Sequence, residues 1–151
     1  MTLALLILWL HLLSAVVWVG GLVYQTHVLL PAARRGGAVA VADMLRRGRP
    51  VMWTGVALSV LTGFYNVTRL GPLDRVMESG AALTLALKFM LVLAAVAIAG
   101  QRDFAQVPRL ARALGDGDDP RPVLAAIAWM DRIVLLLAAV IVFLGLAISR
   151  R

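Results

Sequence analysis

Cysteine is absent from this chain of 151 residues, which excludes disulfides, thiolate metal ligands and cysteine-bound iron–sulfur clusters. Acidic residues are also scarce, because 8 Asp and Glu stand against 15 Lys and Arg, for a net charge of +7. The sequence contains no glycine-rich phosphate loop, no HExxH zinc helix and no GxSxG nucleophile motif. No familiar catalytic signature therefore points to an activity.

Long apolar runs are abundant instead. The chain is 62% hydrophobic, whereas soluble domains are roughly 45–50% apolar. A helix needs ~20 apolar residues to span a bilayer, and four stretches meet that length: Leu3–Leu30, Val51–Arg69, Ala81–Gly100 and Val123–Ser149. No Lys or Arg precedes the first apolar run, which is too long for a signal peptide, so we expect it to be retained. The sequence predicts an all-α integral membrane protein, an antiparallel four-helix bundle forming a single domain over residues 1–151.

The basic charge lies mainly between these runs. Arginines gather in the first and third connections, so anionic lipid headgroups are the expected partners and nucleic acid is not. Ala32–Pro50 is expected to be partly an interfacial helix, with Pro50 in the first turn of the second spanning helix. Gly71-Pro72 is predicted to break that helix before a short polar crossing at Leu73–Gly80. Gly115–Pro120 has the composition of a loop.

Two basic side chains that could bind a metal lie inside the apolar runs. His11 and Lys88 each fall about eight residues after their helix begins, roughly 12 Å along its axis. The first and third helices of a serpentine chain start on the same side of the membrane, so the two groups lie at one depth. Ionisable residues in hydrocarbon are costly and usually functional. The alternatives are an interhelical hydrogen bond for His11 and, for Lys88, a side chain that reaches back to the headgroups.

Each predicted helix carries a stripe of small or polar residues. At 100° per residue, the members of each set fall close to one face, which is expected to turn inward. The stripes are His11, Ser14, Trp18, Gly21 and Gln25; Gly55, Ser59, Thr62, Gly63 and Asn66; Thr84, Lys88, Ala95 and Ala99; and Asp131, Ala138, Gly145 and Ser149.

A second, weaker candidate metal site lies nearer the other end of the helices. His27 is 16 residues beyond His11, about 24 Å along a continuous helix, so the two cannot bind one ion. By the same counting, His27, Met52 and Asp131 share a level. The alternative is an interfacial His27 with Asp131 paired to Arg132.

Several short motifs resemble one family of membrane proteins. Leu10–Leu13 followed by Val17–Leu22 resembles the first helix of the copper-resistance D (CopD) family and of the related HemJ-type protoporphyrinogen IX oxidases. Thr62–Asn66 is similar to the end of the second helix in that group, and Leu85–Leu93 is similar to its third-helix lysine motif. The resemblance spans nearly the whole chain, including its length and four-helix layout.

HemJ-type enzymes are described as haem b proteins with a first-helix His and a third-helix Lys as axial ligands, and the matching positions are His11 and Lys88. The chain departs from that type at two places. It has Tyr24–His27 where an aromatic-Leu-Pro-Arg segment is usual, and Trp129–Arg132 where an Asn-Glu-Pro element is expected. These departures from the resemblance weigh against porphyrinogen oxidation more than against haem binding.

The leading functional hypothesis is a haem b-binding redox protein of the bacterial inner membrane, with protoporphyrinogen IX oxidation as one candidate activity. His11 and Lys88 would be the axial ligands. The cavity would be lined by Ser14, Trp18, Gly21, Ser59, Thr62, Gly63 and Thr84. A membrane redox partner is implied, and self-association into a homo-oligomer is compatible with this interpretation.

Two alternatives stay open at this stage. One is a CopD-like copper-handling protein that uses His11, His27, Met52 and Met90, because thioethers and imidazoles suit copper. The other is a structural subunit of a larger membrane complex.

The arginine distribution gives a prediction of orientation. The first and third connections hold nine arginines, whereas the second connection and the termini hold four. The excess of positive charge predicts that the two richer connections face the cytoplasm and that both termini face outward. A topology reporter fused after Arg151 should therefore be active only as an outside reporter. A strong signal from a cytoplasmic reporter at that position would reverse the assignment.

Overall fold

A computed structural model describes residues 2–69 and 81–149, and every regular element in those ranges is helical. The predicted break at Gly71-Pro72, the crossing at Leu73–Gly80 and the terminal Arg150-Arg151 lie outside the described residues. The predicted all-α membrane fold is confirmed. Three continuous helical stretches are long and apolar enough to cross a membrane: Leu3–Val67, Ala82–Asp116 and Arg121–Ala147.

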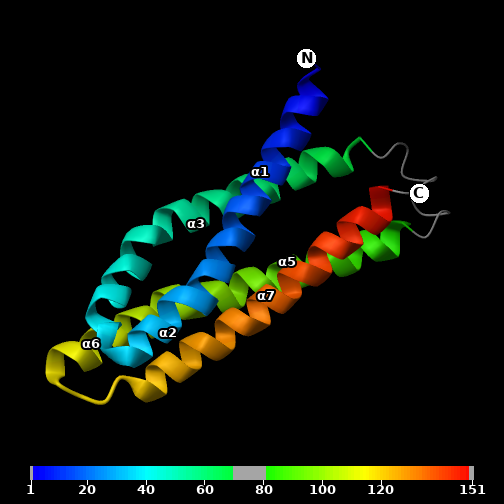
Figure 1. The fold of residues 1–151 in the computed structure, drawn as a ribbon. Coiled ribbons are helices and arrows are strands. Elements are labelled where there is room, and N and C mark those ends of the chain that lie inside the picture. Colours follow the sequence, from blue (N-terminus) through cyan, green and yellow to red (C-terminus); the bar gives the residue numbers. More distant parts are fainter. Residues whose placement is uncertain (1, 70–80, 150–151) are drawn as a thin grey trace.

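The first stretch folds back on itself and forms a hairpin. Helix α1 spans Leu3–Tyr24, and helix α3 spans Ala38–Val67. Between them lie the short helix α2, Leu30–Ala32, and two π-helical segments, η1 at Gln25–Leu29 and η2 at Ala33–Gly37. Inside η2, Gly36 adopts φ 108° and ψ −5°, a backbone conformation that is easily reached only without a Cβ. The chain reverses there, and Figure 1 shows α3 turning back beside α1.

The second half of the chain forms another hairpin. Helix α5 spans Ala81–Gln101, continues through the π segment η3, Arg102–Gln106, and ends as helix α6, Val107–Asp116. Gly117, at φ 77°, terminates α6, and the amide of Asp118 donates to the carbonyl of Ala113 at 2.8 Å. Helix α7, Arg121–Ser149, returns along α5. Figure 1 shows α5 and α7 running side by side along much of their length.

Two expectations about the connections need correction. Helix α3 begins at Ala38, so Pro50 lies inside it rather than in its first turn. An interior proline removes one backbone donor and bends a helix, and α3 changes direction along its length in Figure 1. The loop expected from Gly115 is also shorter than predicted, because α6 continues to Asp116.

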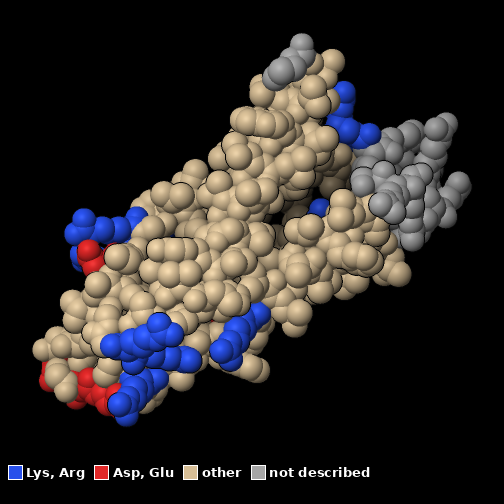
Figure 2. Space-filling view, viewed as in Figure 1, with Lys and Arg blue, Asp and Glu red and all other residues tan. Residues whose placement is uncertain are grey.

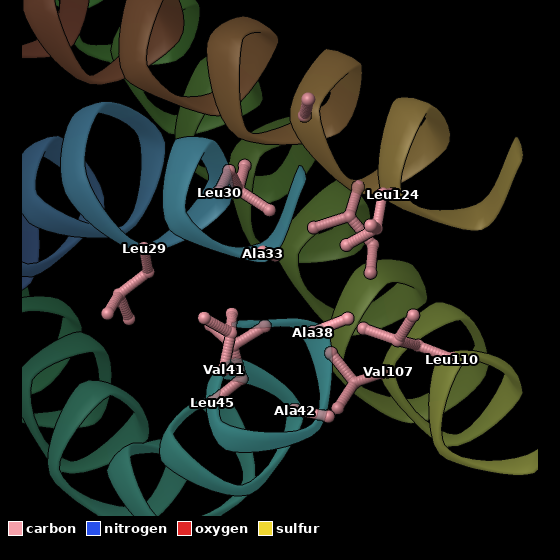
Figure 3. Close-up of a cluster of buried hydrophobic side chains, with 12 residues drawn as sticks. Leu29, Leu30, Ala33, Ala38, Val41, Ala42, Leu45, Val107, Leu110 and Leu124 are labelled. Carbon is pink, nitrogen blue, oxygen red and sulfur yellow. The ribbon is translucent and has the colours of Figure 1, made fainter. Parts of the chain in front are cut away.

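Two buried apolar clusters hold the hairpins together. One lies among η1, α2, α3, α6 and α7 at the end that carries the first and third connections (Figure 3); its residues are Leu29, Leu30, Ala33, Ala38, Val41, Ala42, Leu45, Val107, Leu110, Leu124, Ile127 and Ala128. The other lies farther along the bundle and comprises Trp18, Leu22, Met52, Val56, Ala95, Ala99, Val134 and Ala138.

The surface divides by chemistry in a way that suits a bilayer. Large apolar side chains stay exposed along the long helices, among them Leu12 at 57%, Leu83 at 78% and Phe143 at 68%. Charged side chains in Figure 2 gather mainly at the end that holds α2 and α6. The two arginine-rich connections therefore lie at the same end of the molecule, as an antiparallel arrangement requires.

The turn at Gly36 yields a prediction of stability. A Cβ at φ 108° is strained, so Gly36→Ala should lower the free energy of unfolding by about 1–2 kcal/mol. Gly48→Ala is the control, because Gly48 lies inside α3 with nothing within 4 Å of an added Cβ. That change should raise the free energy of unfolding by roughly 0.5–1 kcal/mol. Thermal unfolding in detergent measures both, and equal effects would show that the turn is not under backbone constraint.

Candidate functional site

A row of polar contacts joins α1 to α3. His11 Nδ1 lies 2.9 Å from Thr62 Oγ1, and one turn further along α1, Ser14 Oγ lies 2.9 Å from Ser59 Oγ. Gly55 continues the row, since a Cβ there would come within 3.3 Å of the Ser14 carbonyl oxygen. The missing side chain thus lets the two backbones approach closely. The polar stripes on the first two predicted helices face each other, as the 100° counting predicts.

The hydrogen bonds at Thr62 fix which nitrogen of His11 carries its proton. The Thr62 hydroxyl donates to the Leu58 carbonyl oxygen, so its own oxygen acts as acceptor toward His11. His11 Nδ1 is then the protonated donor, and Nε2 carries the lone pair. This is the arrangement by which an outer hydrogen bond orients a metal-binding imidazole. Gly63 makes room for the ring, because a Cβ there would meet His11 Cε1 at 3.3 Å.

Lys88 approaches the same space from the other hairpin. It is half-buried on α5, and its Nζ lies against Gly145 of α7, where an added Cβ would come within 3.2 Å. Its amine is close enough to act electrostatically on the His11 imidazole. Thr84, one turn earlier on α5, is also half-buried. Figure 2 shows the surface hollowed between the two hairpins, with basic side-chain atoms inside the hollow. Lys88 therefore lies within electrostatic range of His11, on the facing hairpin.

Other residues of the predicted cavity serve packing. Trp18 is 9% exposed and belongs to the second apolar cluster. Met52, predicted for the second metal site, is 8% exposed and belongs to the same cluster. Met52 lies over Gly21, where any Cβ would come within 2.3 Å of the thioether sulfur. Trp18, Gly21 and Met52 thus form a close crossing of α1 and α3 below the polar row.

The residues of the second predicted site have different surroundings. His27 is exposed, and its Nδ1 bonds to the Val23 carbonyl oxygen of its own helix at 3.0 Å. It borders an open groove of about 530 Å³ together with Arg132. Asp131, by contrast, is fully buried, with its carboxylate 2.8 Å from Arg102 rather than paired to Arg132. Over residues 2–69 and 81–149, no group of three or more His, Asp or Glu side chains gathers as a metal site would require.

A buried ionic cluster that the sequence pattern did not predict joins η1, α3, η3 and α7. Arg102, 3% exposed at the start of η3, contacts Asp103 Oδ1 at 2.6 Å through Nη1 and Asp131 Oδ1 at 2.8 Å through Nε. Its Nη2 donates to Gln25 Oε1 on η1. The indole of Trp53 on α3 donates to Asp103 Oδ2 at 2.8 Å.

Sequence signals for this cluster existed but were assigned to the membrane surface. Arg102 and Asp103 come just after the apolar run Ala81–Gly100, which resembles an ordinary helix end. The helix in fact continues through η3 into α6, and the two side chains turn inward. Both Gln25 and Arg102 open π-helical segments, which often mark functional positions in helices.

The hydrogen bond between His11 and Thr62 gives a prediction. Thr62→Val keeps the shape of the side chain but removes the hydroxyl that accepts the Nδ1 proton. The ring nitrogen shifts of His11 in ¹⁵N NMR should then show a mixture of tautomers, and the free energy of unfolding should fall by about 1 kcal/mol. Thr54→Val, at an exposed position of the same helix, is the control. Unchanged His11 shifts in Thr62→Val would contradict the assigned tautomer.

Comparison with known proteins gives one family. The family model described as copper resistance protein D matches residues 42–148, which includes Thr62, Lys88 and the cluster of Arg102, Asp103 and Asp131. The match begins after α1, so His11 lies outside it. Neither the curated proteins nor the solved structures contain a match to this chain. The match covers well over half of the chain, and this membrane protein belongs to the copper resistance protein D family.

Proposed function

We propose that the protein is a multi-pass protein of the bacterial inner membrane that handles copper in the space between its two hairpins. The family match supports a copper-related role, and the His11 imidazole is the observation that points to where copper is contacted. Its Nδ1 is occupied by Thr62, so the Nε2 lone pair is the available donor. The exposed apolar side chains along the helices support the membrane location.

The donors of this space suit a transported ion more than a tightly held one. His11 and Lys88 contribute one imidazole and one amine, and both bind a metal only in the neutral form. No cluster of three or more His, Asp or Glu residues supplements them in the described ranges. A site with few donors releases its ion readily, which is what a protein that passes copper onward needs. Acid should compete with copper by protonating both groups.

Haem b between His11 and Lys88 is the rival occupant. The approach of these two residues from facing hairpins favours it. The family match names copper resistance and gives no support to haem or to porphyrinogen oxidation. An absorption spectrum distinguishes the two occupants, because only haem gives a Soret band.

Copper retention by single-site variants tests the proposal. Purified protein titrated with Cu(I) at equilibrium against a competing chelator should bind copper without a Soret band. His11→Ala should bind copper at least tenfold more weakly, which is the loss typical when a metal-site group is removed. His27→Ala should retain it, since His27 is exposed and bonded within its own helix.

A pair of substitutions at Lys88 tests its part separately. Lys88→Met supplies a soft thioether in place of the amine and should keep copper, whereas Lys88→Leu should weaken its retention. Equal copper retention by wild type and His11→Ala would contradict the proposed contact. A Soret band that is present in wild type and lost in both His11→Ala and Lys88→Ala would show that the occupant is haem and not copper.

A further inference from the structure

The buried ionic cluster carries more negative than positive charge. Asp103 and Asp131 are 4% and 0% exposed, and Arg102 is the cation that contacts both. If both carboxylates were ionised, a net charge of −1 would be buried in the bundle. An uncompensated buried charge is costly enough that proteins usually neutralise it by taking up a proton or a cation.

The two carboxylates differ in how their oxygens are satisfied. Asp103 accepts from Arg102 at one oxygen and from the Trp53 indole at the other, so its ionised form is fully hydrogen-bonded. Asp131 lies 2.8 Å from Arg102 Nε, but the two atoms are poorly aligned, and neither Asp131 oxygen accepts a hydrogen bond from the described residues. Where two acids share a site, the less well hydrogen-bonded one keeps the proton.

The elements packed around Asp131 offer little else to balance it. Segment η3 supplies Arg102 and Asp103, and η1 supplies the neutral amide of Gln25. On α7 itself, Arg132 is exposed and borders the groove on the other side. The arginines of η2 and α6, Arg34, Arg35, Arg109 and Arg112, are likewise exposed.

The space beside the cluster limits what can bind there. A cavity of about 10 Å³ lies against Arg102 and Asp103, closed on its other sides by Trp18, Leu22 and Met52. That volume is at the lower limit for one water molecule, and a hydrated metal ion is larger. The neighbouring guanidinium also repels a metal cation.

We propose that Asp131 is a proton-binding site, in which a proton on its carboxyl group balances the Arg102–Asp103 ion pair. The cluster joins η1, α3, η3 and α7. Loss of this proton therefore leaves an unbalanced negative charge where the two hairpins meet. Proton release at Asp131 thereby weakens the junction of the hairpins, whose other ends surround His11 and Lys88. The site needs no copper to exist, so its test is independent of the proposed function.

Infrared spectroscopy of the intact protein in detergent, without copper, tests this. Wild type at mildly acidic pH should show the C=O band of a protonated carboxyl group, which disappears as the pH is raised. Asp131→Asn should lack the band. Asp43→Asn should keep it, because Asp43 is a surface residue paired with Arg46 and Arg47.

Asp103→Asn provides a more specific test in the same experiment, because it removes the carboxylate that neutralises Arg102. Asp131 should then become the counterion of Arg102 and lose its proton, so the band should vanish although Asp131 is intact. A protonated carboxyl band that persists in Asp131→Asn, or that is absent from wild type, would overturn the proposal.

Thermal unfolding gives a second measurement. An unfolded Asp releases its proton near pH 4, so above that pH the folded state holds a proton that the unfolded state lacks. Stability should then fall as the pH rises through the titration of the folded cluster. Asp131→Asn should abolish this dependence of stability on pH, whereas Asp43→Asn should keep it. A wild-type stability that rises with pH over the same range would also overturn the proposal.

Discussion

A single guanidinium determines how the two halves of this protein meet. Taking Arg102 out of water costs several kcal/mol unless its donors are satisfied, and no nearby solvent satisfies them, because the side chain is 3% exposed. Its three contacts reach η1, its neighbour Asp103 and α7, and Asp103 reaches α3 through Trp53. The position of each hairpin is therefore fixed at this level by charge and hydrogen bonding, with an apolar cluster on either side of it.

The other end of the bundle has a different character. Within each hairpin the helices stay paired, by the polar row between α1 and α3 and by the close approach of α5 and α7 at Gly145. Between the hairpins the surface is hollowed in Figure 2. The protein thus combines a firm junction at one end with a recess between the hairpins at the other.

Much of the fold could be predicted from the sequence, because apolar runs and polar stripes obey simple geometry. The stripe of His11, Ser14 and Trp18 was found by 100° counting, which holds because α1 is a regular α-helix up to Tyr24. Counting by helix depth gave the further prediction that His11 and Lys88 share one level. These inferences needed only local periodicity.

The ionic cluster could not be predicted in the same way. Charged residues at the end of an apolar run normally lie at the membrane surface, so the sequence pattern placed Arg102 and Asp103 there. Their burial depends on the helix continuing through a π segment and on partners 77 and 50 residues away along the chain. The start of α3 was missed for a related reason, since Pro50 is a breaker by local rules and is tolerated inside a long helix.

The composition of the cluster also bears on how such a protein assembles in a lipid bilayer. All of its charged members, Arg102, Asp103 and Asp131, belong to the second hairpin, whereas the first hairpin contributes a neutral amide and a neutral indole. The charges can therefore find one another within the second hairpin before the first has docked. The first hairpin therefore meets the charged cluster through side chains that carry no charge of their own.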